Sequence, residues 1–112
     1  MDTTTSQSPQ TDPENCNILA FFEIISGKWK PAILYHLIHN DKLRFSELQR
    51  RIPGITQKML TQQLKALEKD NLINRKAYPV VPPKVEYSTT KKGESLDPIF
   101  RSMKKWWQEN AQ

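Results

Sequence analysis

The stretch PGITQKMLTQQLKALEKDNLIN, residues 53–74, decides the fold, because it predicts a turn, a helix and the start of a strand in succession. Pro53-Gly54-Ile55 is typical of a turn, and Thr56 can cap a helix that continues to Asp70. Leu72-Ile73-Asn74 then begins an extended segment. Apolar residues recur at the three-to-four-residue spacing of one buried helix face, at Ile55, Leu60, Leu64 and Leu67.

The opposite face of this helix carries amides, a hydroxyl and amines, and its members include no carboxylate. We call it the polar stripe: Gln57, Lys58, Thr61, Gln62 and Lys65. Side chains of these types contact base edges and phosphates in a DNA major groove. The solvated face of an ordinary amphipathic helix has a similar composition, so the stripe alone leaves both interpretations open.

A β-hairpin is predicted directly after this helix. Residues 73–78 alternate apolar with polar side chains, residues 85–88 do so again, and the proline-rich segment 79–83 between them predicts a stiff, extended tip. The ribbon carries Arg75, Lys76 and Lys84. A helix with a basic, amide-rich face followed by a basic ribbon is typical of a winged helix-turn-helix, in which the hairpin is the wing.

The remaining elements fit that order. Residues 1–15 are rich in Thr, Ser, Gln and Pro and predict a mobile tail, so the folded domain is expected to span residues 16–112. We expect a fold that is mainly α with a small hairpin wing, in the order helix, helix, short strand, helix, helix, hairpin, helix. The expected elements are a helix from Cys16 capped by Asn15 and ending at Ser26-Gly27, a helix over 29–39, a strand over 43–45, a helix capped by Ser46 and ending at Arg51, and a last helix capped by Thr90 and running toward Glu109.

Positive charge is concentrated after residue 15. The chain has 17 Lys and Arg against 12 Asp and Glu residues, a formal net charge of +5. Three of the acidic residues and none of the basic ones lie in residues 1–15, which leaves nine acidic residues and a formal charge of +8 in the rest. This balance favours a polyanionic partner, nucleic acid or an anionic surface, although charge that only aids solubility gives the same count.

The two terminal helices carry more apolar residues than a chain of 112 residues can cover. We therefore predict a homodimer with two-fold symmetry, in which two recognition helices lie about 34 Å apart, one turn of a DNA duplex. The expected interface consists of Ile18, Leu19, Phe21, Phe22, Ile25, Leu96, Ile99, Phe100, Met103, Trp106 and Trp107.

Several classes of function find no support in the sequence. No apolar run has the length of a membrane span and no signal-peptide pattern is present, so we expect a cytoplasmic protein that does not bind membranes. His36 and His39 have the spacing of a metal pair, but no further ligand accompanies them. There is no Gly-rich phosphate loop and no nucleophile elbow. We expect no catalytic residue, no metal and no cofactor.

Motifs along most of the chain resemble those of the HxlR-type family of bacterial transcriptional regulators, over residues 16 to about 107. Their order and spacing are specific, although each is weak alone. The motifs are Cys16, Gly27-Lys28-Trp29, Arg44-Phe45-Ser46-Glu47-Leu48, Ile52-Pro53-Gly54-Ile55, Met59-Leu60-Thr61-Gln62-Gln63-Leu64-Lys65, Leu67-Glu68, Tyr78, Val81-Pro82-Pro83-Lys84-Val85-Glu86-Tyr87 and Thr90-Lys91-Lys92-Gly93. The chain departs from the family at Asn17, where a proline is common, and at Ser26, where a glycine is common.

The resemblance implies a dimeric repressor or activator that binds an inverted repeat in double-stranded DNA. The helix from Thr56 would contact bases, with Gln57 and Gln62 suited to adenine edges, and the hairpin would contact the minor groove or phosphates. The candidate DNA-binding residues are Thr56, Gln57, Lys58, Thr61, Gln62, Lys65, Arg51, Arg75, Lys76 and Lys84. A winged helix that binds protein or RNA without operator specificity is the alternative. The sequence identifies no small effector.

Cys16 is the one cysteine and excludes an internal disulfide. Several relatives in the family sense oxidants or electrophiles through a cysteine at this position, and a helix start favours the thiolate. Glu14 and Asp12 oppose that effect. A redox sensor and a small structural residue at the dimer edge both remain open for Cys16, and any disulfide would join two chains or a small thiol.

Overall fold

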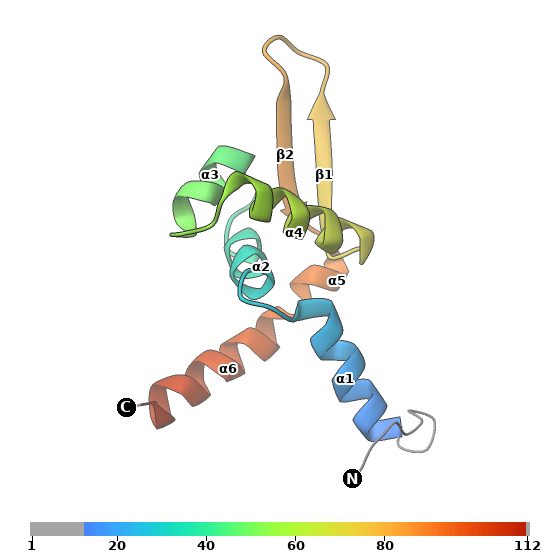
Figure 1. Ribbon diagram of the computed structural model, residues 1–112, viewed down its shortest axis with the longest axis vertical. Coiled ribbons are helices and arrows are strands. Elements are labelled where there is room, and N and C mark those ends of the chain that lie inside the picture. Colours follow the sequence, from blue (N-terminus) through green and yellow to red (C-terminus); the bar gives the residue numbers. More distant parts are fainter. Residues whose placement is uncertain (1–12, 112) are drawn as a thin grey trace.

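The structure is a computed structural model that describes the backbone of residues 13–111 and the side chains of residues 17–111. Residues 1–12 of the mobile tail expected at 1–15 lie outside this range, and residues 13–15 are not part of a tail, because they form the start of the first helix. The described chain forms six helices and one two-stranded antiparallel sheet, which agrees with the predicted fold class (Figure 1). The elements are α1 (Pro13–Ile25), α2 (Lys30–Ile38), α3 (Phe45–Arg51), α4 (Gln57–Lys69), β1 (Ile73–Tyr78), β2 (Lys84–Thr89), α5 (Lys91–Glu94) and α6 (Asp97–Asn110).

Helix α4 begins and ends where the sequence predicts. The Oγ1 atom of Thr56 accepts a hydrogen bond from the backbone N–H of Met59 at 3.1 Å, which caps the helix. The turn before it contains Gly54 with φ of +87°, a conformation that favours glycine. Leu60, Leu64 and Leu67 are at most 2% exposed, so the predicted apolar face is the buried face.

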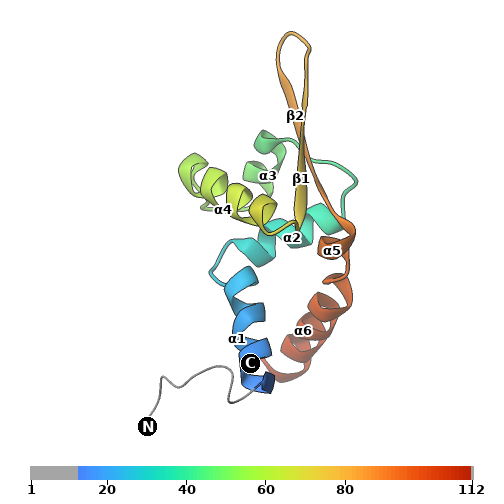
Figure 2. The ribbon, with the colours of Figure 1, turned by 90° about the vertical axis from the view of Figure 1, so that its right-hand side faces the viewer.

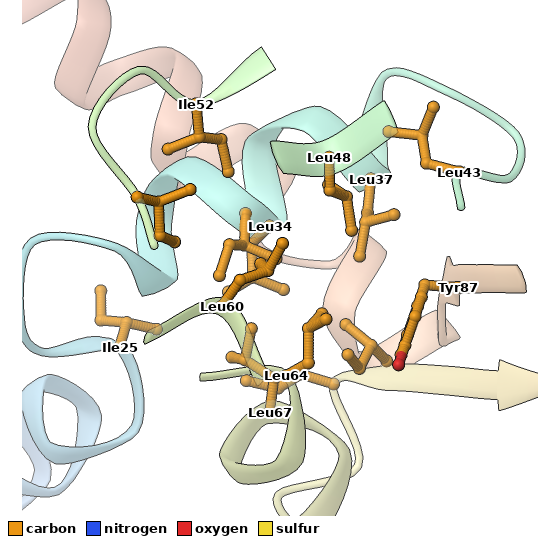
Figure 3. Close-up of a cluster of buried hydrophobic side chains, with 14 of the residues drawn as sticks. Ile25, Leu34, Leu37, Leu43, Leu48, Ile52, Leu60, Leu64, Leu67 and Tyr87 are labelled. Atoms are coloured by element: carbon orange, nitrogen blue, oxygen red, sulfur yellow. The ribbon is translucent and has the colours of Figure 1, made fainter. Parts of the chain in front are cut away.

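The core lies between α2, α3, α4 and the base of the hairpin (Figure 3). Leu34 and Leu37 of α2, Leu48 of α3 and the α4 leucines fill its centre. Tyr87 of β2 closes one side and is 8% exposed. Burial of such side chains stabilises a domain by about 1.5–3 kcal/mol each, so this cluster fixes the position of α4 on the body.

The hairpin is the predicted wing. Strands β1 and β2 pair antiparallel, with Ile73 opposite Thr89 and Tyr78 opposite Lys84. The predicted strand at residues 43–45 is wrong, because Leu43 alone pairs with Tyr87 through two backbone hydrogen bonds of 3.0 and 2.8 Å. The chain leaves the strand conformation at once because Phe45 is already the first residue of α3.

Two predicted helix starts are also wrong. Helix α1 begins at Pro13, three residues before Cys16, so Asn15 lies inside the helix and does not cap it. Proline is well tolerated in a first turn because its missing N–H has no partner there. Helix α3 is preceded by Arg44 and not by Ser46, and the N–H of Arg44 donates to Oε1 of Glu47 at 2.7 Å.

The expected last helix is two helices. Thr90 caps α5 as predicted, with its Oγ1 accepting from the N–H of Gly93 at 3.0 Å. The helix then breaks before Asp97, since Pro98 has no N–H to donate to the fourth carbonyl before it. Gly93 itself fits closely under Leu72, because a Cβ there would clash with the Leu72 carbonyl oxygen. That contact joins α5 to the start of β1.

Helices α1 and α6 project from the end of the molecule opposite the hairpin (Figures 1 and 2). Helix α2 lies between the two ends, since it packs against α3 and β2 as well as against α5 and α6. Among the described residues, no helix has both the length and the apolar character needed to cross a membrane.

Candidate nucleic-acid interface

The polar stripe is on the outer surface of α4, away from the core. Gln57, Lys58, Gln62 and Lys65 are exposed. Thr61 differs from the expectation, because it is half-buried and its hydroxyl donates to the Gln57 carbonyl at 2.8 Å. Thr61 lines the groove described next, but its only hydroxyl proton is used within the helix.

A groove of about 490 Å³ separates α4 from the base of the hairpin. The stripe residues Thr61 and Lys65 line one wall, and Arg75 of β1 lines the other. The polar stripe and the hairpin therefore face one shared space. The complete lining is Phe45, Gln57, Thr61, Leu64, Lys65, Glu68, Arg75 and Tyr87.

Glu68 places a carboxylate in this groove, which the sequence analysis missed. It is seven positions after Thr61 and three after Lys65, so helical periodicity puts it on the same side of α4. The carboxylate-free stripe thus covers the first two and a half turns of α4 and ends at Glu68. Negative charge at that point disfavours phosphate contacts near the carboxyl end of α4, so the amino-terminal part of the helix is the part suited to DNA.

Two of the three hairpin cations, Lys76 and Lys84, lie beside one aromatic ring. The Nζ atoms of Lys76 and Lys84 lie 5.1 and 5.0 Å from the ring centroid of Tyr78. The Tyr78 hydroxyl donates to Oε1 of Glu86 at 2.8 Å, and Lys84 pairs with Oε2 of Glu86 at 3.5 Å. This hydrogen bond raises the pKa of Tyr78 and lowers the pKa of Glu86. The contacts hold both lysines beside the ring, a role for Tyr78 and Glu86 that sequence reasoning did not assign.

Arg51 lies at the end of α3 and is exposed. Its charge acts on the neighbouring helix, where the pKa of His36 is lowered from 6.5 by burial first, and then by Arg51 and His39. His36 is half-buried, so water reaches only part of its imidazole. His39 faces the other end of the molecule, with its Nε2 atom 3.6 Å from Oδ1 of Asp97 in α6.

The apolar residues assigned to a dimer interface fall into two groups. Ile25, Leu96 and Phe100 are buried within the single chain, and Phe21 packs against the core. The others remain strongly exposed, from Ile99 at 41% to Trp107 at 65%. On α6 they follow an i, i+4, i+7 spacing that forms one continuous face. The exposed set is Ile18, Leu19, Phe22, Ile99, Met103, Trp106 and Trp107.

Within the described residues, no group of three or more His, Cys, Asp or Glu side chains could hold a metal ion. His36 and His39 belong to no such group, although Asp97 lies beside His39. The backbone of Cys16 lies in the second half of the first α1 turn, and its side chain is outside the described residues.

Comparison with known proteins identifies helix-turn-helix regulators as the relatives of this chain. The family model described as HxlR-like helix-turn-helix matches residues 24–112. The HTH-type transcriptional regulator YdeP of Bacillus subtilis is 50% identical over 95 residues, which cover 85% of this chain and 73% of YdeP.

Two solved structures with the same fold bear names that refer to redox state. The redox regulator HypR in its reduced form superimposes with a TM-score of 0.79 at 47% identity, covering 84% of this chain and 92% of that one. The reduced form of the transcriptional regulator YodB from B. subtilis superimposes with a TM-score of 0.76 at 32% identity, covering 86% and 93%.

Proposed function

Because the chain belongs to the HxlR-like helix-turn-helix family and is a winged-helix transcriptional regulator, we propose that it binds an inverted-repeat operator in double-stranded DNA as a homodimer. The observation that carries this proposal is the groove shared by the α4 stripe and the hairpin, which Gln57, Lys65 and Arg75 line together. A duplex laid against α4 meets the hairpin as well.

The two parts of this surface have different tasks. Gln57 and Gln62 present amides that match the N6 and N7 edge of adenine in the major groove, and Lys58 can reach guanine or a phosphate. Lys65, Arg75, Lys76, Lys84 and Arg51 contact phosphates and fix the register of the protein on DNA. Thr56 closes the amino end of α4, where unpaired N–H groups and the helix dipole favour a phosphate.

The dimer is formed by α1 and α6. Exposure of more than half of the Trp106 and Trp107 side chains, on a helix that projects from the body, creates an apolar face with no cover in the single chain. A second copy related by two-fold symmetry covers that face with its own equivalent. The same symmetry places two α4 helices on successive major-groove turns, about 34 Å apart. A regulator of this kind works in the cytoplasm, beside the chromosome.

Cys16 is proposed as a redox-responsive residue of the dimer. Support comes from its place near the start of α1, one of the two dimerisation helices, and from similarity to proteins that are named redox regulators. Oxidation joins Cys16 to the partner's Cys16 or to a small thiol. In either case an oxidant such as diamide takes up the two electrons and two protons that the two thiols lose.

Competition binding tests DNA recognition. A labelled duplex that the protein itself selects from a random library is challenged with unlabelled duplex, with one of its single strands, and with double-stranded RNA of the same sequence. Only the duplex DNA is expected to compete at low concentration, since B-form major-groove edges are absent from the other two. Equal competition by RNA, or failure to enrich any sequence, contradicts an operator-binding function and supports a binding module of the alternative kind.

Diamide treatment tests the redox response separately. Binding of the selected duplex is measured before and after treatment, and again after a reducing agent is added, in the parent protein and in Cys16→Ser. We expect treatment to change the affinity of the parent and to leave Cys16→Ser unaffected. An unchanged parent removes the redox proposal and leaves the DNA-binding proposal in place.

A further inference from the structure

The tip of the hairpin exposes apolar side chains that do nothing for the core. Val81 is 99% exposed and Val80 is 49% exposed, between Pro79 on one side and Pro82-Pro83 on the other. Proline fixes its own φ and restricts the residue before it, so the tip loses little freedom when it binds. The hairpin carries this tip well beyond the helices (Figures 1 and 2).

Positive charge surrounds the hairpin just below this tip. Lys76 and Lys84 flank the ring of Tyr78, and Arg75 reaches into the groove beside α4. Glu86 is the one carboxylate of the two strands, and it is engaged by the Tyr78 hydroxyl and by Lys84. We call Lys76 and Lys84 the collar. An exposed apolar tip beyond two amines fits a narrow groove that has phosphates along both walls and a floor that an apolar side chain can contact. A bare protein surface or a single-stranded nucleic acid offers no such paired walls.

We propose that Val81 enters the minor groove next to the major groove occupied by α4, and that it selects base pairs lacking the guanine 2-amino group. This inference rests on the proposed operator binding. The minor groove is about 6 Å wide and 7.5 Å deep, and of the four bases only guanine places a donor, the N2 amino group, on its floor. The Val81 side chain cannot accept a hydrogen bond from that amino group, and the amino group occupies the space that the side chain would need. A·T pairs present a smoother floor.

The turn at the hairpin tip fits this placement. Val81 is three residues beyond Tyr78, and the Val80 N–H donates to the Tyr78 carbonyl at 2.9 Å, so the chain turns immediately beyond Lys76, Tyr78 and Lys84 and places Val81 close to them. The Lys76 and Lys84 amines therefore lie just behind Val81, beside the phosphates that form the groove walls when Val81 is in the minor groove. The lysines then supply affinity without regard to sequence, and Val81 supplies the choice of base pair.

Inosine substitution tests the inference, because an I·C pair has the major-groove edge of G·C and the minor-groove edge of A·T. The duplex selected by the protein is prepared with A·T, G·C or I·C at each position that flanks the α4 half-sites. At the position under the hairpin tip we expect A·T and I·C to bind alike and G·C to bind about tenfold more weakly, the cost of one mismatched pair. Equal binding of G·C and I·C at every flanking position overturns the inference.

Two variants separate the tip from the collar. Val81→Ser keeps the hairpin and removes most of the apolar side chain, so the tenfold preference is expected to disappear. Lys76→Gln is the matched control on the same hairpin, and it should weaken all three duplexes equally while lowering the salt dependence by about one phosphate contact. Survival of the A·T preference in Val81→Ser assigns that preference elsewhere and overturns the role of Val81. A parent protein that shows no sequence preference within the half-sites is a different result. It refutes operator binding itself.

Discussion

The two ends of this molecule differ in how completely the chain covers its own apolar surface. At the hairpin end, Leu60, Leu64 and Leu67 of α4 are buried, the outer face of α4 is polar, and the strongly exposed apolar residues are the two valines of the hairpin tip, Val80 and Val81. At the other end, Phe22 of α1 and Trp106 of α6 are more than half exposed. The hairpin end therefore covers most of its apolar surface within a single chain and exposes charge, whereas the end formed by α1 and α6 exposes apolar area. The difference separates the surface for DNA from the surface for a second copy.

The same substitution at the two ends gives the largest expected contrast. Leu60→Ala removes a fully buried side chain and is expected to lower the free energy of unfolding by about 2–5 kcal/mol. Leu19→Ala changes a side chain that is 55% exposed, so it should cost much less when the protein is dilute. Urea unfolding at several protein concentrations measures both. Equal losses at the lowest concentration would show that the terminal helix is as well covered in one chain as α4.

A charge placed on the exposed face of α6 sharpens the comparison at the dimer end. Trp106→Asp is expected to weaken self-association by at least about 2 kcal/mol, because buried tryptophans dominate interfaces and an unpaired charge there is costly. Lys105→Asp adds the same carboxylate at a neighbouring exposed position and serves as the control. Sedimentation equilibrium should show dissociation for the first variant only. A monomeric parent protein at micromolar concentration, or the same shift in both variants, would exclude α6 as the interface.

Two truncations at the hairpin end should divide specificity from affinity. Gln62→Ala is expected to relax the choice at one base pair by about 1–3 kcal/mol and to leave the salt dependence unchanged. Arg75→Ala should weaken binding to all sequences and lower the slope of affinity against salt by about one. Fluorescence anisotropy with selected and scrambled duplexes at three salt concentrations distinguishes the outcomes. If both variants bind as the parent does, the assignment of the α4 stripe and the hairpin is wrong.

The smallest expected effect concerns pH and the helix that joins the two ends. On α2, His36 is affected by Arg51 of α3, while His39 lies beside Asp97 of α6. The pKa of His36 is lowered from 6.5, so the folded state takes up its proton less readily than the unfolded state. The free energy of unfolding should therefore fall as the pH falls below 6.5, and the loss is complete below the lowered pKa.

Arg51→Gln tests the cause of this shift. Removing the guanidinium charge should move the pKa of His36 upward toward 6.5, as followed by NMR titration of the imidazole. Burial is the larger cause, so part of the shift should remain. His36→Gln supplies the stability curve without this titration. A pKa of His36 that does not respond to Arg51→Gln would place the effect with burial and His39 alone.

Local patterns explain what the sequence predicted well. The limits of α4 follow from Thr56, Gly54 and a regular leucine spacing, and the hairpin follows from two alternating runs around a proline-rich tip. The capping of α5 by Thr90 is also local in origin. Each of these features depends on residues within a few positions of one another, which is why a single sequence suffices.

The features that the sequence analysis missed depend on competition or on distant contacts. Both Ser46 and Arg44 could precede α3, and the choice fell to Arg44 because the Glu47 side chain reaches its N–H. The division of the last helix is an exception, because Pro98 is a local signal that predicts it. The groove that brings Glu68 near Arg75, and the Tyr78–Glu86 contact, required the pairing of separate elements to be known.

The central claim is that a two-fold dimer presents two α4 helices to one face of a duplex. Its most direct test is the symmetry and spacing of the DNA that the protein selects from a random library. We predict an inverted repeat whose half-sites are centred about 10 base pairs apart, with binding lost when about five base pairs are inserted between them. Selection of a single unpaired half-site, or binding that is indifferent to the insertion, would contradict the account.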